Sequence, residues 1–254
     1  MRKKELVFDK EFAMKVWNIE QNEFPEVLII QGQRVVERNL QYVEEKLFES
    51  SRRLNVGDVI IGKFKNRNFV FASGFGASLL ADITHISVLL GIKYIILIGT
   101  CGGLNIELNR NDILIPKIVI GNDGVSDWYI KNKLIKTDSL VREELIKSLN
   151  YLNRKWFMGN TISVSSMLME NRELINLWSE SNLFGVDMEA SAVFAVANKF
   201  QVKCGGLLFV MDNLIKEKDV VDFTEEERNI DKNLMFKMMD VAFYTGLNLL
   251  LKTN

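Results

Sequence analysis

Short apolar runs alternate with segments of helical periodicity along the chain, and this alternation constrains the fold more than any other feature. Apolar runs with the length of buried strands lie at residues 27–30, 58–62, 69–73, 94–98, 113–120, 161–164 and 206–210. Segments with apolar residues spaced as in amphipathic helices lie at residues 35–48, 77–90, 139–149, 172–179, 188–200 and 233–251. The pattern predicts an α/β fold, a three-layer αβα sandwich around a mostly parallel, mixed sheet.

The composition indicates an ordinary globular protein without a polyanionic partner. Of the 254 residues, 48% are hydrophobic and 26% are charged, and 32 basic residues against 33 acidic ones leave a net charge of −1. This balance provides no general attraction to nucleic acid or to an acidic membrane, although a small anion needs only a few local cations. With two prolines and no linker-like segment, residues 1–254 are expected to form a single domain.

Few side chains are available for metal or disulfide chemistry. Cys101 and Cys204 lie among apolar and glycine neighbours and are expected to be buried free thiols. His85 is the single histidine, which excludes a multi-histidine metal site. The basic start is not followed by an apolar signal segment, and no uncharged apolar run approaches the roughly 18 residues of a membrane span. We therefore expect a cytoplasmic location and no membrane partner.

Glycine-rich turns, an arginine and an acid follow predicted strands that end at one rim of the sheet. The segments QGQR (31–34), SGFGAS (73–78), GTCGG (99–103) and MDN (211–213) each come directly after an apolar run. Ligands of α/β sheets bind beyond the carboxyl ends of the strands, where glycines let backbone N–H groups approach an anion. Packing of a helix on a strand is the alternative explanation for either glycine-rich turn. Neither turn has the lysine of a P-loop or the complete dinucleotide fingerprint.

The hexapeptide GVDMEA at residues 185–190 has the clearest chemical signature. Glu189 falls in the first turn of the predicted helix 188–200, where an acid favours the helix dipole. Because Met188 and Ala190 flank it in an apolar segment, its carboxylate should be partly buried, which is costly without hydrogen-bond partners. The vicinal hydroxyls of a sugar are two such partners. A dipole effect and sugar binding both account for an acid at this position.

Together these motifs resemble the nucleoside phosphorylase/uridine phosphorylase family. The resemblance rests on GVDMEA (185–190), on IGTCGG (98–103) and on VMDN (210–213). NDILI (111–115) and DGVS (123–126) match stretches between these motifs, and the order fits from about residue 27 to about residue 228. The resemblance implies a nucleoside phosphorylase-like fold that cleaves the base–ribose bond of a nucleoside. It also implies a homo-oligomer, either a dimer or a trimer-of-dimers hexamer.

For the nucleoside itself, the resemblance implies five residue roles. Glu189 would accept hydrogen bonds from the ribose 2′- and 3′-hydroxyls, and Met188 would pack on the ribose. Asp212 matches the acid that protonates N7 of the departing base in purine-specific members, which favours a purine; a turn-capping Asp is the alternative. Arg228 is the candidate for the arginine that contacts this acid, or else a solvated surface charge. Met167 falls near an aromatic that stacks on base or ribose, or else belongs to the core.

The resemblance also implies a phosphate site. Arg34 matches the phosphate-binding arginine of the first strand–helix turn, Thr100 matches the hydroxyl residue that contacts phosphate, and Gly74 lies where the family closes over phosphate and ribose. Arg53, or its neighbour Arg52, would be delivered by a neighbouring subunit. Phosphate is then the co-substrate, and neither a metal ion nor an organic cofactor is expected.

Departures from the family pattern concern mainly the phosphate site. Residues 31–34 lack the Asp and Pro of the usual first turn, and Leu97 replaces an arginine that phosphorylases carry two residues before the Gly-Thr/Ser turn. A phosphate dianion normally needs charge-assisted, preferably bidentate donors, and Arg34 alone is a single cation. His85 lies in a predicted helix, so it does not fill the role of the family's N-terminal histidine, which reaches the neighbouring subunit's ribose.

We expect phosphorolysis of a purine nucleoside to free base and ribose 1-phosphate, a reaction of nucleoside salvage. A nucleosidase that hydrolyses methylthioadenosine- or adenosylhomocysteine-type nucleosides is the main alternative, because those relatives also lack the arginine at the position of Leu97. Their glutamate-rich first turn is not reproduced here. A uridine phosphorylase and a nucleoside-binding protein without turnover are further alternatives.

Overall fold

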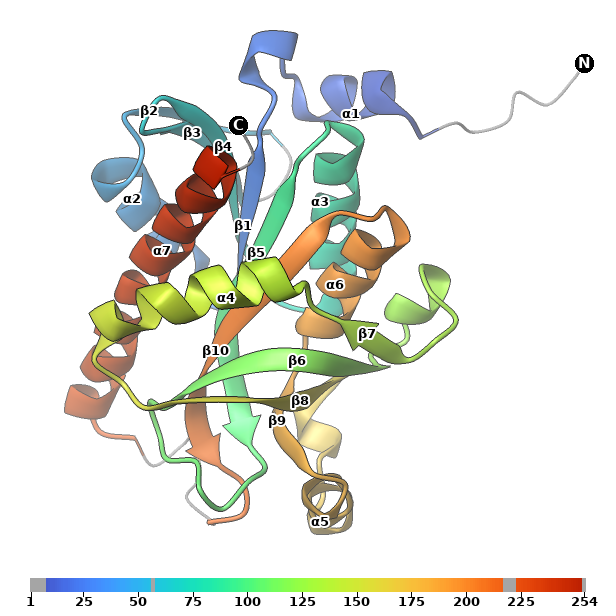
Figure 1. Ribbon diagram of the computed structural model, residues 1–254, viewed down its shortest axis with the longest axis vertical. Coiled ribbons are helices and arrows are strands. Elements are labelled where there is room, and N and C mark those ends of the chain that lie inside the picture. The colour runs from blue at the N-terminus through green and yellow to red at the C-terminus, as the bar shows by residue number, and fades with distance from the viewer. Residues whose placement is uncertain (1–7, 56–57, 217–222, 253–254) are drawn as a thin grey trace, which may run out of the picture.

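The computed structural model describes residues 8–55, 58–216 and 223–252, which form a mixed sheet with helices on both faces (Figure 1). The strands are β1 (Val27–Gly32), β2 (Ser50–Arg53), β3 (Val59–Phe64), β4 (Arg67–Gly74), β5 (Tyr94–Gly103), β6 (Ile113–Asn122), β7 (Leu134–Lys136), β8 (Trp156–Val164), β9 (Leu183–Asp187) and β10 (Lys203–Asn213). The α-helices are α1 (Lys10–Trp17), α2 (Val36–Lys46), α3 (Ala77–Leu89), α4 (Ser139–Ser148), α5 (Arg172–Glu180), α6 (Ala190–Lys199) and α7 (Glu225–Lys252). Short 3-10 helices are η1 (Gln21–Glu23), η2 (Ser126–Trp128), η3 (Leu149–Leu152) and η4 (Met167–Met169).

The sheet is open at one end and closed at the other. Strand β1 pairs in parallel with β4 and β5, and β3 and β2 extend the open end as antiparallel strands. Beyond β5, the strands β10, β6, β8 and β9 form a ring, because β5 pairs with both β10 and β9. The expected α/β architecture of a mixed sheet between helices is confirmed, and the ring is an addition that the sequence pattern did not predict.

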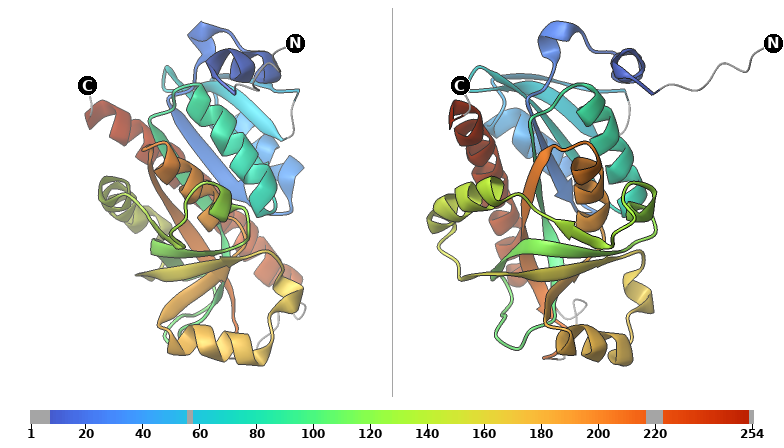
Figure 2. Two further views of the ribbon diagram at one scale, coloured as in Figure 1. Left: turned by 90° about the vertical axis from the view of Figure 1, so that its right-hand side faces the viewer. Right: turned by 45° about the vertical axis from the view of Figure 1, so that its right-hand side comes forward.

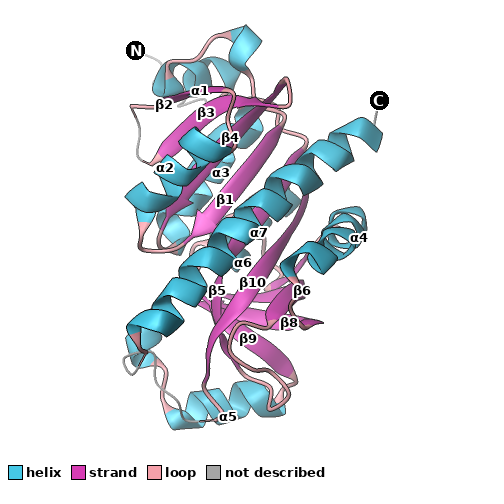
Figure 3. Cartoon of the chain, turned by 90° about the vertical axis from the view of Figure 1, so that its left-hand side faces the viewer, coloured by secondary structure: helices cyan, strands magenta, loops and turns pink. Residues whose placement is uncertain are grey.

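Strand β1 shows how the layers form. Val27 and Ile29 face one core cluster while Leu28 and Ile30 face the other, because successive side chains of a strand point to opposite faces. Helices α2, α4 and α7 cover the first face, and α1, α3 and α6 cover the second (Figure 3). Burial on both faces explains why this strand reads as a continuous apolar run. Figure 2 shows α5 at the end of the molecule opposite α1.

Helix α7 crosses the first face of the sheet and provides much of its core. An apolar helix was expected at residues 233–251, and its apolar stripe is fully buried, namely Met235, Met238, Met239, Ala242 and Phe243. The helix begins at Glu225, eight positions before the predicted start at residue 233. By length and composition it could cross a membrane, but most of its apolar window is buried inside the protein, as in a core helix.

The hexapeptide GVDMEA (185–190) divides between a strand and a helix, which corrects the predicted helix 188–200. Its first three residues end β9, a strand the sequence pattern did not predict, and α6 begins only at Ala190. Asp187 accepts hydrogen bonds from the backbone N–H groups of Glu189 and Ala190, at 2.9 and 2.7 Å. These bonds satisfy donors that a helix start leaves unpaired. Glu189 is therefore the N-cap residue of α6 rather than a member of its first turn.

Candidate active site

A cavity of about 400 Å³ opens where β1, β5, β9 and β10 reach their carboxyl ends. Most of the expected site residues line it, namely Arg34, Thr100, Met167, Met188, Glu189, Asp212 and Arg228. Strands that are neighbours in the sheet, not in the sequence, bring these side chains together. Gly74 and Arg53 are the two expected residues that do not line the cavity.

Glu189 connects three segments of the rim. Its Oε1 accepts a hydrogen bond from the backbone N–H of Gly76 at 2.9 Å. Gly76 has a φ of +94°, a conformation that favours glycine. On the other side, a Cβ at Gly32 would lie only 3.1 Å from Glu189 Oε2, so glycine permits the close approach of β1. Both glycines therefore let the backbone approach this carboxylate closely.

The Glu189 carboxyl is poorly solvated. The residue is 7% exposed. Burial raises its pKa to about 7, and the charge of Asp187 acts in the same direction. The hydrogen bonds from backbone N–H groups and the charge of Arg34 lower the pKa by less than burial raises it. A buried carboxylate has acceptor capacity beyond the bond from Gly76, and neighbouring hydroxyl donors from a sugar would stabilise its charge.

Asp187 is a cavity residue that the sequence reasoning missed, although it lies inside the hexapeptide. Besides starting α6, its Oδ1 accepts a hydrogen bond from Ser163 Oγ at 2.9 Å. Its Oδ2 is buried and has no hydrogen-bond partner among the described residues. Burial raises the pKa of Asp187 to about 6. A second poorly solvated carboxyl therefore lies next to Glu189.

A β-bulge aims Asp212 into the cavity. Val210 and Asp212 pair with consecutive residues of β5, which leaves Met211 as the extra residue. Behind the bulge, buried Asn213 donates from Nδ2 to two backbone carbonyls of the loop before β6, at 2.9 and 2.8 Å. Its Oδ1 accepts from the N–H groups of residues 215 and 216, so Asn213 itself caps the turn after β10. This anchoring fixes the strand end from which Asp212 projects.

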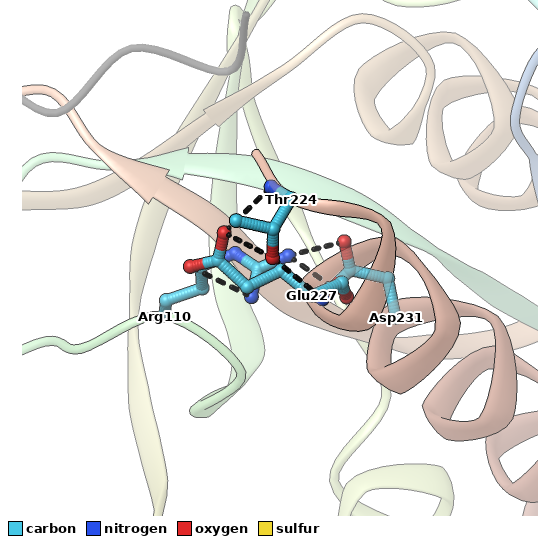
Figure 4. A network of polar contacts seen from close by, with 4 residues as sticks. All are labelled: Arg110, Thr224, Glu227 and Asp231. Atoms are coloured by element: carbon cyan, nitrogen blue, oxygen red, sulfur yellow. Dashed lines mark hydrogen bonds and ion pairs between the residues drawn. The ribbon is translucent and has the colours of Figure 1, made fainter. Parts of the chain in front are cut away.

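Arg228 is exposed and also lines the cavity from the first turn of α7, which a polar network anchors (Figure 4). Thr224 and Glu227 each bind the other's backbone N–H, at 2.9 and 3.2 Å, as in a capping box. Arg110 donates to Asp231 and to the Glu227 carbonyl, so it ties the loop before β6 to this turn. Arg110 is a positioning residue that no sequence motif had indicated.

Arg34 and Met167 meet across the mouth of the cavity. Arg34 Nη2 lies 3.6 Å from Met167 Sδ, and its guanidinium lies 4.4 Å from the ring centroid of Phe75. Met167 is 43% exposed, so it is a cavity residue and not part of the core. Gly74 does not line the cavity, although its neighbour Phe75 does. The Gly74 carbonyl instead accepts a hydrogen bond from the Gln33 N–H at 2.8 Å.

The remaining expected phosphate ligand lies elsewhere in the chain. Arg53 forms ion pairs with Glu37 and Glu44 at 2.7 and 2.8 Å, so within one chain it is not part of the cavity. Arg52 is likewise paired with Glu23. Delivery of Arg53 to a neighbouring subunit stays a prediction. Leu97 is 1% exposed within the core beneath α3 and α6.

Two other sequence expectations concern His85 and the two cysteines. His85 lies in α3, as predicted, and its Nδ1 is 3.2 Å from Tyr129 Oη, away from the cavity lining. Cys101 and Cys204 are buried free thiols, as predicted, and burial raises the pKa of each. Cys101 nevertheless lines the cavity, where its Sγ lies 3.8 Å from the Phe209 carbonyl oxygen.

The charged lining of the cavity is more acidic than basic. Among the described lining residues the cations are Arg34 and Arg228, and the acids are Glu170, Asp187, Glu189 and Asp212. Glu170 is half-buried, and burial followed by the charge of Asp212 raises its pKa to about 7. Across the described ranges, no group of three or more His, Cys, Asp or Glu side chains is placed to hold a metal ion. The arrangement provides hydrogen-bond acceptors for a sugar and acids for proton transfer.

Comparison with known proteins identifies the family. The sequence profile of the phosphorylase superfamily matches residues 32–238. The chain is 23% identical over 227 residues to the DeoD-type purine nucleoside phosphorylase of Buchnera aphidicola subsp. Acyrthosiphon pisum, covering 84% of this chain and 93% of that protein. It is 24% identical over 247 residues to the DeoD-type 2 enzyme of Vibrio vulnificus, covering 91% and 98%. The chain therefore belongs to the phosphorylase superfamily, and its relatives place it among the nucleoside phosphorylases.

Solved structures with the same fold include enzymes named for different bases. The P. knowlesi homologue of P. falciparum PNP superimposes with a TM-score of 0.76 at 20% identity, covering 99% of this chain and 97% of that one. Uridine phosphorylase from Vibrio fischeri ES114 superimposes with a TM-score of 0.75 at 20% identity, covering 92% and 94%. The fold alone therefore does not distinguish a purine from a pyrimidine substrate.

Proposed function

We propose that this protein transfers the ribosyl group of a purine nucleoside to phosphate, releasing the free base and ribose 1-phosphate. The observation that carries the proposal is the position of Asp212, an acid at the bulged end of β10, in the same cavity as Glu189. A purine leaving group needs a proton donor, and Asp212 would be that donor. Glu189 would accept hydrogen bonds from the sugar. Arg228, which lines the same cavity, would hold this acid.

The proposed reaction breaks the bond between the ribose carbon C1′ and the base nitrogen N9. Electrons of this bond move onto the purine, and protonated Asp212 donates its proton to N7, which lowers the barrier to departure. Glu189 holds the ribose 2′- and 3′-hydroxyls while positive charge develops on the sugar, and Met188 packs against it. Phosphate, bound by Arg34 and Thr100, then forms the new bond to C1′.

Hydrolysis is the second candidate, and buried Leu97 is the observation that favours it. No cation occupies this position beneath the site, and Arg34 is exposed at the cavity mouth. Strong phosphate binding normally uses several charge-assisted donors. Water would need none of them, so the same ribose and base contacts could serve a nucleosidase.

One experiment separates the two reactions. Purified protein is incubated with adenosine, inosine, methylthioadenosine or uridine, with and without phosphate, and free base, ribose and ribose 1-phosphate are quantified. Phosphorolysis requires base release that depends on phosphate and yields ribose 1-phosphate in equal amount. Equal base release without phosphate contradicts the phosphorylase proposal, and cleavage of uridine alone contradicts the purine assignment.

A pair of variants tests the role of Asp212. Asp212→Asn removes the proton donor while keeping the shape, and kcat for the purine nucleoside should fall by about 10²- to 10⁴-fold, the usual contribution of a general acid. Asp127→Asn, at an exposed position outside the cavity, is the control and should leave kcat unchanged. Full activity of the Asp212 variant would show that another group protonates the base.

The proposal includes a cytoplasmic homo-oligomer in which a neighbouring subunit supplies Arg53. This residue is held by Glu37 and Glu44 on its own chain, at the open end of the sheet. Arg53→Gln should raise the KM for phosphate and leave the KM for the nucleoside unchanged. Sedimentation of a monomer that is fully active contradicts this part of the proposal.

A further inference from the structure

Glu170 is an acid of the cavity to which neither the sequence motifs nor the proposed mechanism assign a role. It follows η4 directly, and its backbone N–H donates to the Met167 carbonyl at 3.2 Å. The next residue, Asn171, caps α5 by accepting from the Leu174 N–H at 2.9 Å. Glu170 is therefore held between the end of one helix and the start of another, and its backbone position is well defined.

The segment that carries Glu170 is fastened to the segment that carries Asp212. Arg172 Nη1 donates to the Leu214 carbonyl at 2.8 Å, just beyond the end of β10. Leu214 and Leu174 also pack against the same apolar cluster. Glu170, Asp212 and Leu214 line the same cavity, and the charge of Asp212 acts on the Glu170 carboxyl, whereas Met167, at the start of η4, contacts Arg34.

The Glu170 carboxyl has no hydrogen bond or ion pair with the residues that the structure describes. It is half-buried, and burial together with the charge of Asp212 raises its pKa to about 7, so the ionised form predominates at pH 8. The other charged groups that line the cavity are Arg34, Asp187, Glu189, Asp212 and Arg228. An ionised carboxylate in this position has free acceptor capacity for an N–H group of a ligand.

The edge of a purine offers a donor beside N7 only when position 6 carries an amino group. In adenine, N7 accepts and the adjacent 6-amino group donates, whereas in guanine both N7 and O6 accept. The inference rests on the proposed function, in which Asp212 donates to N7. Since Glu170 lines the same cavity as Asp212 and its segment is bonded to the residue after the end of β10, we infer that it accepts a hydrogen bond from the 6-amino group and selects 6-aminopurine over 6-oxopurine nucleosides.

The test compares kcat/KM for adenosine and inosine at pH 8, which differ in the group at position 6. The wild-type protein should prefer adenosine by about 10- to 100-fold, the effect of one charge-assisted hydrogen bond. In Glu170→Gln the amide can accept from an amino group or donate to O6, so the two values should come within about threefold of each other. Glu173→Gln, at an exposed position three residues along, is the matched control and should keep the wild-type ratio.

Outcomes of these assays distinguish failure of this inference from failure of the proposed function. Wild-type preference for inosine, or an equal loss of both activities in Glu170→Gln, overturns the inference while phosphorolysis of purines stands. Calorimetric binding of free adenine and hypoxanthine provides a readout that needs no turnover. Glu170-dependent preference for adenine in a protein that cleaves no purine nucleoside supports the inference and contradicts the proposed function.

Discussion

Replacing Glu189 by glutamine should weaken catalysis and, above neutral pH, stabilise the fold. The amide can keep Oε1 as the acceptor of the Gly76 N–H, but it replaces Oε2 by a donor. The loss of one hydrogen bond to a charged acceptor, about 1.5–3 kcal/mol, corresponds to roughly a 10- to 100-fold lower kcat/KM. With 2′-deoxyadenosine one of the two hydroxyl contacts is already absent, so the loss should be smaller than with adenosine.

The stability effect follows from the pKa of Glu189, which lies at about 7 in the fold instead of the ordinary 4.5. Folding therefore takes up a proton between these pH values, and the wild-type protein loses stability as the pH rises through this window. The difference between these two pKa values corresponds to about 3 kcal/mol of lost folding free energy at pH 8. Glutamine does not ionise, so the variant avoids this loss of stability. The free energy of unfolding of Glu189→Gln relative to wild type should therefore increase from pH 4.5 to pH 8.

Urea denaturation at several pH values and steady-state kinetics with both nucleosides measure the two effects. Glu180→Gln, on the exposed surface of α5, is the control and should change neither. A stability difference that stays constant between pH 4.5 and pH 8 contradicts the argument from burial. Equal loss of kcat/KM for adenosine and 2′-deoxyadenosine contradicts the ribose contact of Glu189.

Three further predictions concern a turn at the site, the anchoring of α7 and the packing of the core. Gly76→Ala and Gly124→Ala both place a side chain at positive φ with open space around the Cβ, so each should cost about 1–3 kcal/mol, but only Gly76→Ala should lower kcat/KM. Arg110→Met should lower kcat by about 10- to 100-fold through misplacement of Arg228, with partial recovery in Arg110→Lys; unchanged kcat in a folded Arg110→Met contradicts the anchoring role. Phe243→Ala empties a fully buried aromatic position and should cost about 3–5 kcal/mol in chemical denaturation, and a loss below 1 kcal/mol contradicts the packing account.

Local sequence patterns predicted the parts of this protein that depend on local physics. A strand buried on both faces must be apolar throughout, and β1 and β10 were recognisable for this reason. A helix on the sheet needs one apolar stripe, and the methionine-rich stripe of α7 is fully buried as expected. Because an acid rarely occurs in an apolar segment without partners, Glu189 could also be identified as a candidate site residue.

Strand β9 and the contacts of Arg110 with the start of α7 were not predicted, because their causes are tertiary. The five residues of β9 are too few to show a period, and they form a strand because β5 and β8 provide their hydrogen bonds. At the start of α7, a local capping box joins Thr224 and Glu227, and Arg110, which lies more than a hundred residues away in the sequence, ties this turn to the loop before β6. Sequence spacing contains no information about such pairings.

The sequence by itself determined which layers form and that the carboxylate of Glu189 is at least partly buried. The tertiary structure decided which side chains surround this carboxylate. It brought Asp187 and Glu170 into the cavity and kept Arg53 paired with acids of its own chain. It left Gly74 outside the cavity lining, where its carbonyl forms a backbone hydrogen bond. The physical reason is that apolar burial is encoded residue by residue, whereas the neighbours of a polar group depend on how distant strand ends meet.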